Sequence, residues 1–222
     1  MNVIKGLITK DILQLKSYKK TLIIFIMVFA FTSISVQDGV ENMLVIMLTL
    51  GFGMFSMASF NYDEFNKADR YILTLPLTKK EVVLSKYILV ICSTVMGSII
   101  GIMLSYIVMF AMNKQMPNIE EIISVGLGGI LGIGLIEAIQ IPCVYKWGAE
   151  KRRIQMVIVT AIVALLAGGI IFIGEKANIQ LPTNNILNIV NTFLPLIFLG
   201  LTIIIYYMSY KVAYKIYDKK EI

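Results

Sequence analysis

The sequence predicts an all-α integral membrane protein of six transmembrane helices. Of its 222 residues, 58% are hydrophobic and only 15% are charged, whereas soluble domains are about 45–50% apolar and about 25% charged. Several segments approach the roughly 20 apolar residues that a spanning helix requires. The basic residues fall almost entirely on alternate connections. The length suits a single transmembrane domain over residues 1–222.

The expected spans and connections follow from the apolar runs. The spans cover residues 20–36, 43–60, 87–112, 122–145, 154–173 and 194–210. The connections cover residues 37–42, 61–86, 113–121, 146–153 and 174–193. The first two spans are short, but Tyr18 can extend the first, and Lys19 and Lys20 can carry their charges to the interface.

The basic residues predict the orientation. With the N-terminus inside, the four cytoplasmic segments hold five, five, four and four Lys or Arg residues, whereas the outer loops hold only Lys114 and Lys176. Cytoplasmic loops carry this excess in membrane proteins, so both termini are expected in the cytoplasm. The same distribution accounts for the net charge of +6. No nucleic-acid partner is expected, because such binding needs a basic face on a soluble surface.

Residues 1–19 predict an amphipathic helix ahead of the first span. Its apolar residues recur at helical spacing, with Lys5, Thr9 and Gln14 elsewhere around the helix. A basic amphipathic helix of this kind lies in the membrane interface. The alternative is a cytoplasmic extension of the first span.

The connection 61–86 contains a well-defined helix start. Thr78 and Glu81 have the spacing of a capping box, in which each side chain bonds the backbone N–H of the other residue. Pro76 ends the segment before it. The helix of the third span is therefore expected to begin near Lys79, about two turns before its apolar part.

The segment before Pro76 predicts a short helix that mixes charged and apolar residues. It carries Asp63, Phe65, Arg70, Tyr71 and Leu75. A plain connection between two spans needs only a few residues, but this one uses 26. Aromatic anchors of this type are typical of docking sites, so we interpret the connection as a stiff cytoplasmic elbow for a protein partner. The alternative is an elbow that rests on lipid headgroups.

The outer connection 174–193 is long and partly apolar. Ile186, Leu187, Val190 and Phe193 can share one face of a short helix after a turn at 182–185. The segment is either an outer re-entrant hairpin between the fifth and sixth spans or a surface loop.

Glu137 is the one charged residue deep within a span, and Gln140 lies one turn later on the same face. Pro142 follows, and a proline frees backbone carbonyls in its helix. An intramembrane carboxylate is by default a functional-site hypothesis, so Glu137 and Gln140 are candidates for a substrate path that attracts a cationic group. The alternatives are a hydrogen-bonded pair within the bundle and a water-filled cytoplasmic vestibule, neither of which contacts the substrate.

Two stripes of small residues predict close helix packing, because small side chains let membrane helices approach. The third span carries Ser93, Gly97, Gly101 and Ser105 at intervals of four. The fourth span carries Ser124, Gly128 and Gly132.

Several chemistries are excluded by residue type. The chain has no histidine, which removes His-ligated metal sites and Ser-His or Cys-His mechanisms. No Walker motif, zincin motif or nucleophile elbow is present. We therefore expect no catalytic residue, no bound metal and no cofactor in this chain.

Two cytoplasmic segments resemble those of ABC-2 type permeases. "DEFNKADRYILTLPLTKKEVVLSKY" is similar to the first cytoplasmic loop of the short bacterial members, and "IPCVYKWGAEKRR" resembles a second-loop element that here comprises Tyr145, Gly148, Lys151 and Arg153. The resemblance implies that 61–86 is a coupling helix seated in an ATPase subunit, and that an outer hairpin precedes the sixth span. It also implies a multi-pass protein of the bacterial plasma membrane.

The resemblance further implies the partners and the activity. A separate ATPase subunit would bind ATP and Mg²⁺, and a second identical or homologous permease would complete the transporter. The chain is similar to membrane subunits that export amphipathic peptides such as phenol-soluble modulins, so the expected function is ATP-driven export of an amphipathic or lipophilic substrate, such as a peptide toxin or antimicrobial peptide. The alternatives are an ion-coupled secondary transporter that uses Glu137 and a membrane enzyme.

Overall fold

The structure is helical throughout the part of the chain that it describes. The computed structural model describes residues 3–34, 40–72, 74, 77–114, 116–149, 151, 154–155, 157–162, 165 and 184–219. The helices are α1 (Val3–Leu15), a 3-10 turn (Lys16–Tyr18), α2 (Lys19–Ile34), α3 (Val40–Ser56), α4 (Ala58–Phe65), α5 (Ala68–Ile72), α6 (Lys79–Ala111), α7 (Ile119–Trp147) and α9 (Asn184–Asp218). These residues contain no strand, so the expected all-α class is confirmed for them.

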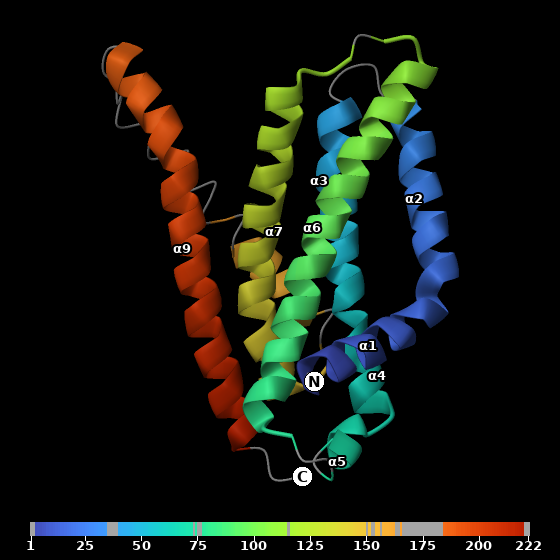
Figure 1. Ribbon diagram of the computed structural model, residues 1–222, viewed down its shortest axis with the longest axis vertical. Helices are drawn as coiled ribbons and strands as arrows, with labels where there is room; N and C mark the ends of the chain where they lie inside the picture. The colour runs from blue at the N-terminus through green and yellow to red at the C-terminus, as the bar shows by residue number, and fades with distance from the viewer. Residues whose placement is uncertain are drawn as a thin grey trace.

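The long helices stand side by side (Figure 1). Helix α3 packs mainly against α6 and also against α2 and α7, while α9 packs against α7 and α6. Helix α1 lies across the lower part of this bundle, at a steep angle to α2 (Figure 1). We call the end that carries α4, α5 and the last turn of α9 the basal end. The connection between α6 and α7 lies at the opposite end (Figure 1).

Three helical stretches of the described residues are long and apolar enough to cross a membrane: Glu41–Phe65, Lys79–Ala111 and Ile119–Trp147. They correspond to the second, third and fourth expected spans. Helix α2, the first expected span, has 16 residues, and most of the fifth expected span lies outside the described residues. Many large apolar side chains are exposed on α2, α6 and α9, as expected for helices that contact lipid tails.

One expected element has the form that the sequence predicts, and another takes a different form. The N-terminal helix is distinct from the first span, because the chain turns between α1 and α2 (Figure 1). The helix expected within the outer connection begins at Asn184 but does not stop before the sixth span. It continues as α9 to Asp218 without a break. The rest of that connection, 174–183, lies outside the described residues.

The predicted start of the third span is confirmed in detail. Helix α6 begins at Lys79, and Thr78 is its N-cap. The Glu81 carboxylate accepts from the Thr78 N–H at 2.9 Å, and the Glu81 N–H donates to the Thr78 hydroxyl at 3.4 Å. Both orphan N–H groups are thereby satisfied, which stops the helix from fraying as it enters the bundle.

The small residues of the third span let α6 approach α3, as predicted. A Cβ atom at Gly97 would lie 2.8 Å from the Leu48 carbonyl oxygen, and one at Gly101 would lie 2.8 Å from the Val45 Cα atom. Ser93 donates to the Phe52 carbonyl oxygen at 2.7 Å. Contact between backbones is what makes this helix pair tight.

The small residues of the fourth span make no such contact with the residues that the structure describes, so that expectation stays a prediction. No described atom lies within 4 Å of a Cβ placed at Gly128 or Gly132, and Ser124 is exposed. The close approaches of α7 occur instead at Gly126, beside the Ser98 hydroxyl, and at Gly134, beside the Tyr206 ring. The close approaches of α7 to described helices therefore fall on a different face from the stripe.

Candidate functional site

The tip of the elbow exposes two aromatic side chains. Helices α4 and α5 are joined by a tight turn in which Lys67 has a φ of +50°. Phe65 and Tyr71 are 85% and 74% exposed, whereas Ile72 is buried in the core. The side chain of Arg70, and Leu75 and Pro76 altogether, lie outside the described residues. The elbow thus anchors itself through Ile72 and leaves Phe65 and Tyr71 uncovered at the basal end.

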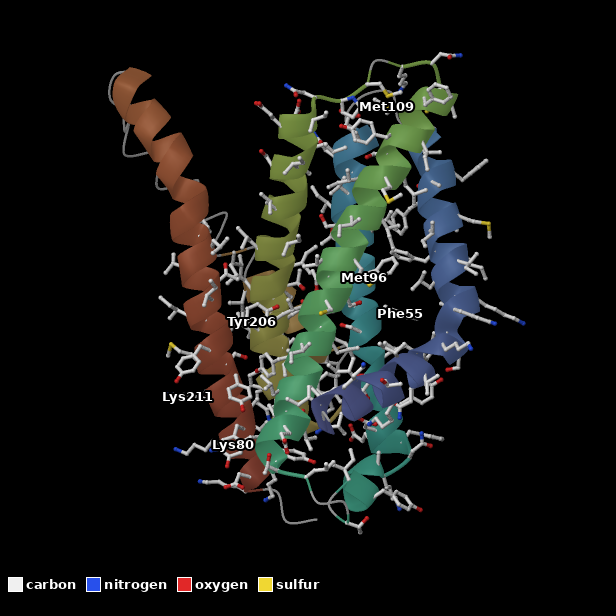
Figure 2. All side chains as sticks on the ribbon, in the orientation of Figure 1. Phe55, Lys80, Met96, Met109, Tyr206 and Lys211 are labelled. Carbon is white, nitrogen blue, oxygen red and sulfur yellow. The ribbon has the colours of Figure 1, made fainter. Side chains whose placement is uncertain are left out.

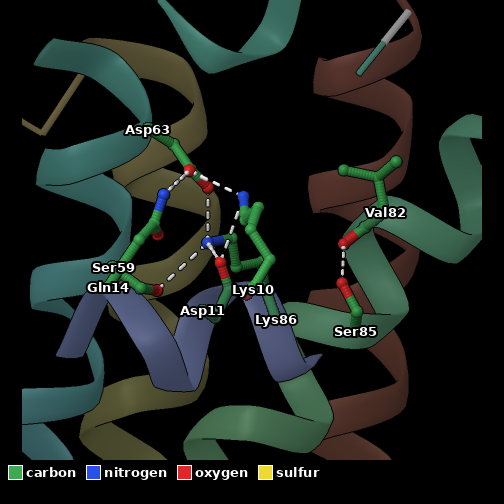
Figure 3. Close-up of polar contacts among 8 residues, drawn as sticks. All are labelled: Lys10, Asp11, Gln14, Ser59, Asp63, Val82, Ser85 and Lys86. Carbon is green, nitrogen blue, oxygen red and sulfur yellow. Dashed lines mark hydrogen bonds and ion pairs between the residues drawn. The ribbon is translucent and has the colours of Figure 1, made fainter. Parts of the chain in front are cut away.

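Asp63 does not belong to this exposed surface. The sequence groups it with the residues that face a partner, but the structure buries it between α1, α4 and α6 (Figure 3). Its Oδ1 atom accepts from Lys10 Nζ at 2.7 Å and from Gln14 Nε2 at 3.2 Å, and its Oδ2 atom lies 2.5 Å from Lys86 Nζ. Asp63 therefore holds the bundle together instead of facing outward.

A second aspartate completes a buried ionic cluster, which we define as Lys10, Asp11, Asp63 and Lys86. Lys86 Nζ lies 2.9 Å from Asp11 Oδ1 and 3.1 Å from Ser59 Oγ, and Lys10 Nζ lies 3.1 Å from Asp11 Oδ1. The two cations and two anions balance. Burial opposes the charge on Lys10, but Asp11 and Asp63 together raise its pKa above the ordinary value. The ionic cluster ties α1 to the elbow and to α6.

The elbow is also tied to the second basal connection. Helix α7 ends at Gly148, whose φ of +85° is a left-handed conformation that favours glycine. A Cβ there would lie 2.7 Å from Glu64 Oε1, and the Ala149 N–H donates to Glu64 Oε2. The positive φ favours glycine at 148, whereas a side chain there would only require the flexible Glu64 carboxylate to shift. Nearby, Tyr145 packs edge-on against the Phe60 ring.

The end of α9 joins the same region. Lys79 Nζ bonds the Asp218 carbonyl oxygen at 2.7 Å and lies 3.4 Å from its carboxylate. Tyr217 is fully buried and packs edge-on against Tyr145. Among the residues predicted for the second connection, Lys151 is exposed and Arg153 lies outside the described residues. The basal end therefore joins α1, α4, α6, α7 and α9 in one packed base.

Higher in the bundle, Glu137 sits where α3, α6, α7 and α9 meet. It is only 3% exposed. Its Oε2 atom accepts from Thr94 Oγ1 at 2.9 Å and from the Tyr206 hydroxyl at 3.4 Å, and Figure 2 shows Tyr206 between α9 and α7. Its Oε1 atom is buried against Gly53, with no hydrogen-bond partner among the described residues. A buried carboxylate oxygen in this position can take a proton or accept from a donor group.

Pro142 adds polarity close to Glu137, as its place in the sequence predicts. A proline cannot donate to the carbonyl four residues earlier, which here belongs to Ala138. The Ser209 hydroxyl of α9 donates to that carbonyl oxygen, and the Tyr87 hydroxyl lies 2.6 Å from Ser209 Oγ. Gln140 is buried beside this region. Hydroxyl groups of α6 and α9 thus line the face of α7 that carries Glu137.

Sequence reasoning did not single out several residues that the structure makes important. Lys10 and Lys86 contribute only to the count of basic residues in the cytoplasmic segments, and the sequence pattern gives Asp11 and Glu64 no role. One signal was available: Asp11 lies four residues after Leu7, which places this acid on the apolar face of α1, where both are buried. Within the described residues, no group of three or more Cys, Asp or Glu side chains is arranged to hold a metal ion.

Comparison with known proteins supplies the family. A model of the ABC-2 family transporter protein matches residues 6–218, nearly the whole chain. No curated protein and no solved structure matches. Members of this family are the permease components of ATP-binding cassette transporters, which work with a separate ATP-binding subunit. The match covers α1, the elbow, the ionic cluster and Glu137, and the chain belongs to the ABC-2 family of transporter proteins.

Proposed function

We propose that this permease is the membrane half of an ATP-driven exporter, and that the elbow formed by residues 61–86 docks in a cytoplasmic ATPase subunit that binds ATP and Mg²⁺. The observation that carries this proposal is the exposure of Phe65 and Tyr71 on an otherwise well-anchored tip. Aromatic side chains that protrude from a rigid base are typical anchors of protein interfaces. Glu64 and Asp63 hold that base to α7, α1 and α6, so a force on the tip would reach the bundle.

The proposal includes the orientation and the assembly. The basal end faces the cytoplasm of a bacterial cell, because the basic residues of the chain concentrate in the segments found there. Both termini lie on that side. Two permease chains, identical or homologous, pair with two ATPase subunits, and closure of the ATPases switches the bundle between inward-open and outward-open states.

The proposed substrate is an amphipathic or lipophilic molecule, such as a cationic peptide with toxin or antimicrobial activity. The buried Glu137 carboxylate supports this choice, because its Oε1 atom has no partner among the described residues and is complementary to an ammonium or guanidinium group. Hydroxyl groups of Thr94 and Tyr206 orient the carboxylate from the other side.

Replacing both Phe65 and Tyr71 with alanine tests the docking surface. Each aromatic side chain contributes about 1.5–3 kcal/mol when it becomes fully buried, so the double variant is expected to bind the ATPase subunit about a hundredfold more weakly or worse. The permease itself should remain folded in the membrane, because neither side chain packs in its core. The measurement is co-purification of the ATPase subunit, together with ATP hydrolysis by the reconstituted complex.

Phe110→Ala is the matched control, because Phe110 is as exposed as Tyr71 but lies at the opposite end of α6. It should leave co-purification unchanged. A double elbow variant that co-purifies and transports like the parent protein would assign Phe65 and Tyr71 to contact with lipid headgroups.

Replacing Glu137 with glutamine tests the substrate path. The amide keeps an oxygen for Thr94 and Tyr206 but removes the charge. Export of a cationic amphipathic peptide should fall about tenfold or more, since a hydrogen bond to a charged group is worth about 1.5–3 kcal/mol. Assembly and basal ATP hydrolysis should persist. Thr94→Val serves as the control for lost hydrogen bonding without lost charge, and unchanged export by Glu137→Gln would make the residue a packing element.

A further inference from the structure

A groove of about 1080 Å³ lies between α2 and the α3–α4 rod, away from Glu137, and it reaches the tip of the elbow at Phe65 and Lys67. Its volume is at the upper end of the range for small-molecule sites. Figure 2 shows Phe55 on the side of the rod that faces α2. The functions argued above use Phe65 and Glu64 at its basal end but give no role to its apolar part.

The lining of the groove changes from apolar to polar along its length. Leu22 and Phe25 of α2 face Phe52, Met54 and Phe55 of α3 along its inner part. Along α4 and the turn that follows, the lining residues become polar. They include Asn61, Glu64 and Lys67. The apolar part, residues 51–58, covers about 10 Å at 1.5 Å per residue.

The groove is closed at its inner end and walled by aromatic rings. A Cβ at Gly51 would lie 2.2 Å from the Phe25 ring, so α2 and α3 touch there. Towards the basal end, the Tyr18 ring packs edge-on against the Phe55 and Tyr62 rings, with centroids 5.8 and 5.2 Å apart. The groove is therefore a slot that begins between two helices of the bundle and opens at the basal end.

The polar end carries a cation that is free to bind. Lys67 is exposed and forms no ion pair with any residue that the structure describes. The Glu64 carboxylate lines the same end, and the Ala149 N–H donates to its Oε2 atom. Among the described lining residues, Lys67 is the one cation that can pair with an anionic group.

We propose that this groove binds one phospholipid of the surrounding bilayer, with an acyl chain along Phe25, Phe52 and Phe55 and the phosphate at Lys67. The apolar part belongs to the membrane-spanning stretch Glu41–Phe65, and its length of about 10 Å fits within one leaflet, which is half of a hydrocarbon core of about 30 Å. The polar end falls at the depth of the headgroups.

A phospholipid fits the groove better than a peptide does. The part of the bound molecule that lies in the inner part of the groove must be hydrocarbon. The groove walls there are rings and aliphatic groups with few hydrogen-bonding side chains. A peptide backbone in that part would leave its N–H and C=O groups unsatisfied, which costs several kcal/mol for each group in an apolar setting. An acyl chain has no such groups.

The test uses the purified full-length permease in nanodiscs that contain phosphatidylglycerol with a photoreactive diazirine in one acyl chain. We expect cross-links on residues 51–58 and 20–25. Met54→Trp, which fills the groove, should lower the yield at these sites at least fivefold. Met103→Trp, on the exposed face of α6, is the matched control and should leave that yield unchanged.

Lys67→Glu is a second variant that does not depend on filling the groove, and it removes no core packing because Lys67 is exposed. Native mass spectrometry of detergent-extracted protein should show one retained phospholipid per chain, with retention lost in Lys67→Glu and kept in Lys67→Arg. Equal labelling of the groove and of the α6 face, unaffected by Met54→Trp, would overturn the proposal in favour of annular lipid. Displacement of the lipid by a cationic amphipathic peptide that cross-links to the groove would overturn it in favour of a peptide site.

Discussion

Replacing Lys86 with methionine is expected to destabilise the permease by about 3–5 kcal/mol, the usual effect of removing one partner from a buried ion pair. Methionine keeps the length and the apolar stem of the lysine. The loss is electrostatic, because Asp11 and Asp63 would remain buried with only Lys10 to neutralise two carboxylates. Helix α1 should detach first, since the ionic cluster is its main polar tie to α6.

The fluorescence of Trp147, the one tryptophan of the chain, reports this change in thermal unfolding of the detergent-purified protein. Lys79→Met is the matched control: it lies on the same helix, and its pair with Asp218 is partly exposed. Pairs of that kind contribute about 0–1 kcal/mol. Equal shifts of the unfolding midpoint in the two variants would show that the ionic cluster stabilises the permease no more than the partly exposed Lys79–Asp218 pair does.

A double variant separates charge imbalance from lost packing. Lys86→Met with Asp11→Asn leaves Lys10 and Asp63 as a balanced pair 2.7 Å apart. The double variant is expected to regain part of the stability that Lys86→Met loses, so the two substitutions should be non-additive, as neighbouring residues are. A double variant that is less stable than Lys86→Met by the full cost of Asp11→Asn would contradict the balance argument.

Gly97→Leu is expected to have the second largest effect, because it forces α6 away from α3. A Cβ at Gly97 would lie 2.7 Å from Phe52 Cβ, 2.8 Å from the Leu48 carbonyl oxygen and 3.0 Å from Thr49 Cα. Two of these atoms belong to the backbone, so no rotamer change relieves the clash. Overpacking costs about 1–3 kcal/mol and more where the backbone must move. The measurement is the unfolding midpoint, with the yield of monodisperse protein beside it.

Gly128→Leu is the control for Gly97→Leu, since no described atom lies within 4 Å of a Cβ at that position. Leucine has a higher helix propensity than glycine by about 1 kcal/mol, so this variant should be neutral or slightly more stable. A large loss of stability in Gly128→Leu would show that a helix packs on this face of α7 after all.

The features that could be predicted from the sequence are local or periodic. The capping box of Thr78 and Glu81 depends on residues three apart, and the close approach at Gly97 and Gly101 depends on spacing along one helix. The carbonyl freed by Pro142 follows from the covalent structure of proline. Each is a property of one helix or its cap.

The features that could not be predicted depend on which helices become neighbours. A stripe of small residues marks one face of a helix, but only the rotation of α7 decides whether that face meets another helix, and Gly128 and Gly132 meet none of the described residues. The continuous helix from Asn184 into the sixth span was also not expected, because Pro182 and two asparagines suggest a turn but do not show where the next helix stops.

By itself, the sequence determined that this is a helical membrane protein with a capped elbow at Thr78 and a single deep carboxylate at Glu137, because composition, spacing and caps act over a few residues. Only the tertiary structure decided that Asp63 turns inward to Lys86, and that Asp11 pairs with the same lysine across 75 positions of sequence. The position of a lysine in the sequence does not show which carboxylate it will contact when the two residues are so far apart in the chain. Burial makes this pairing necessary, since an unpaired charge among packed helices strongly destabilises the folded protein.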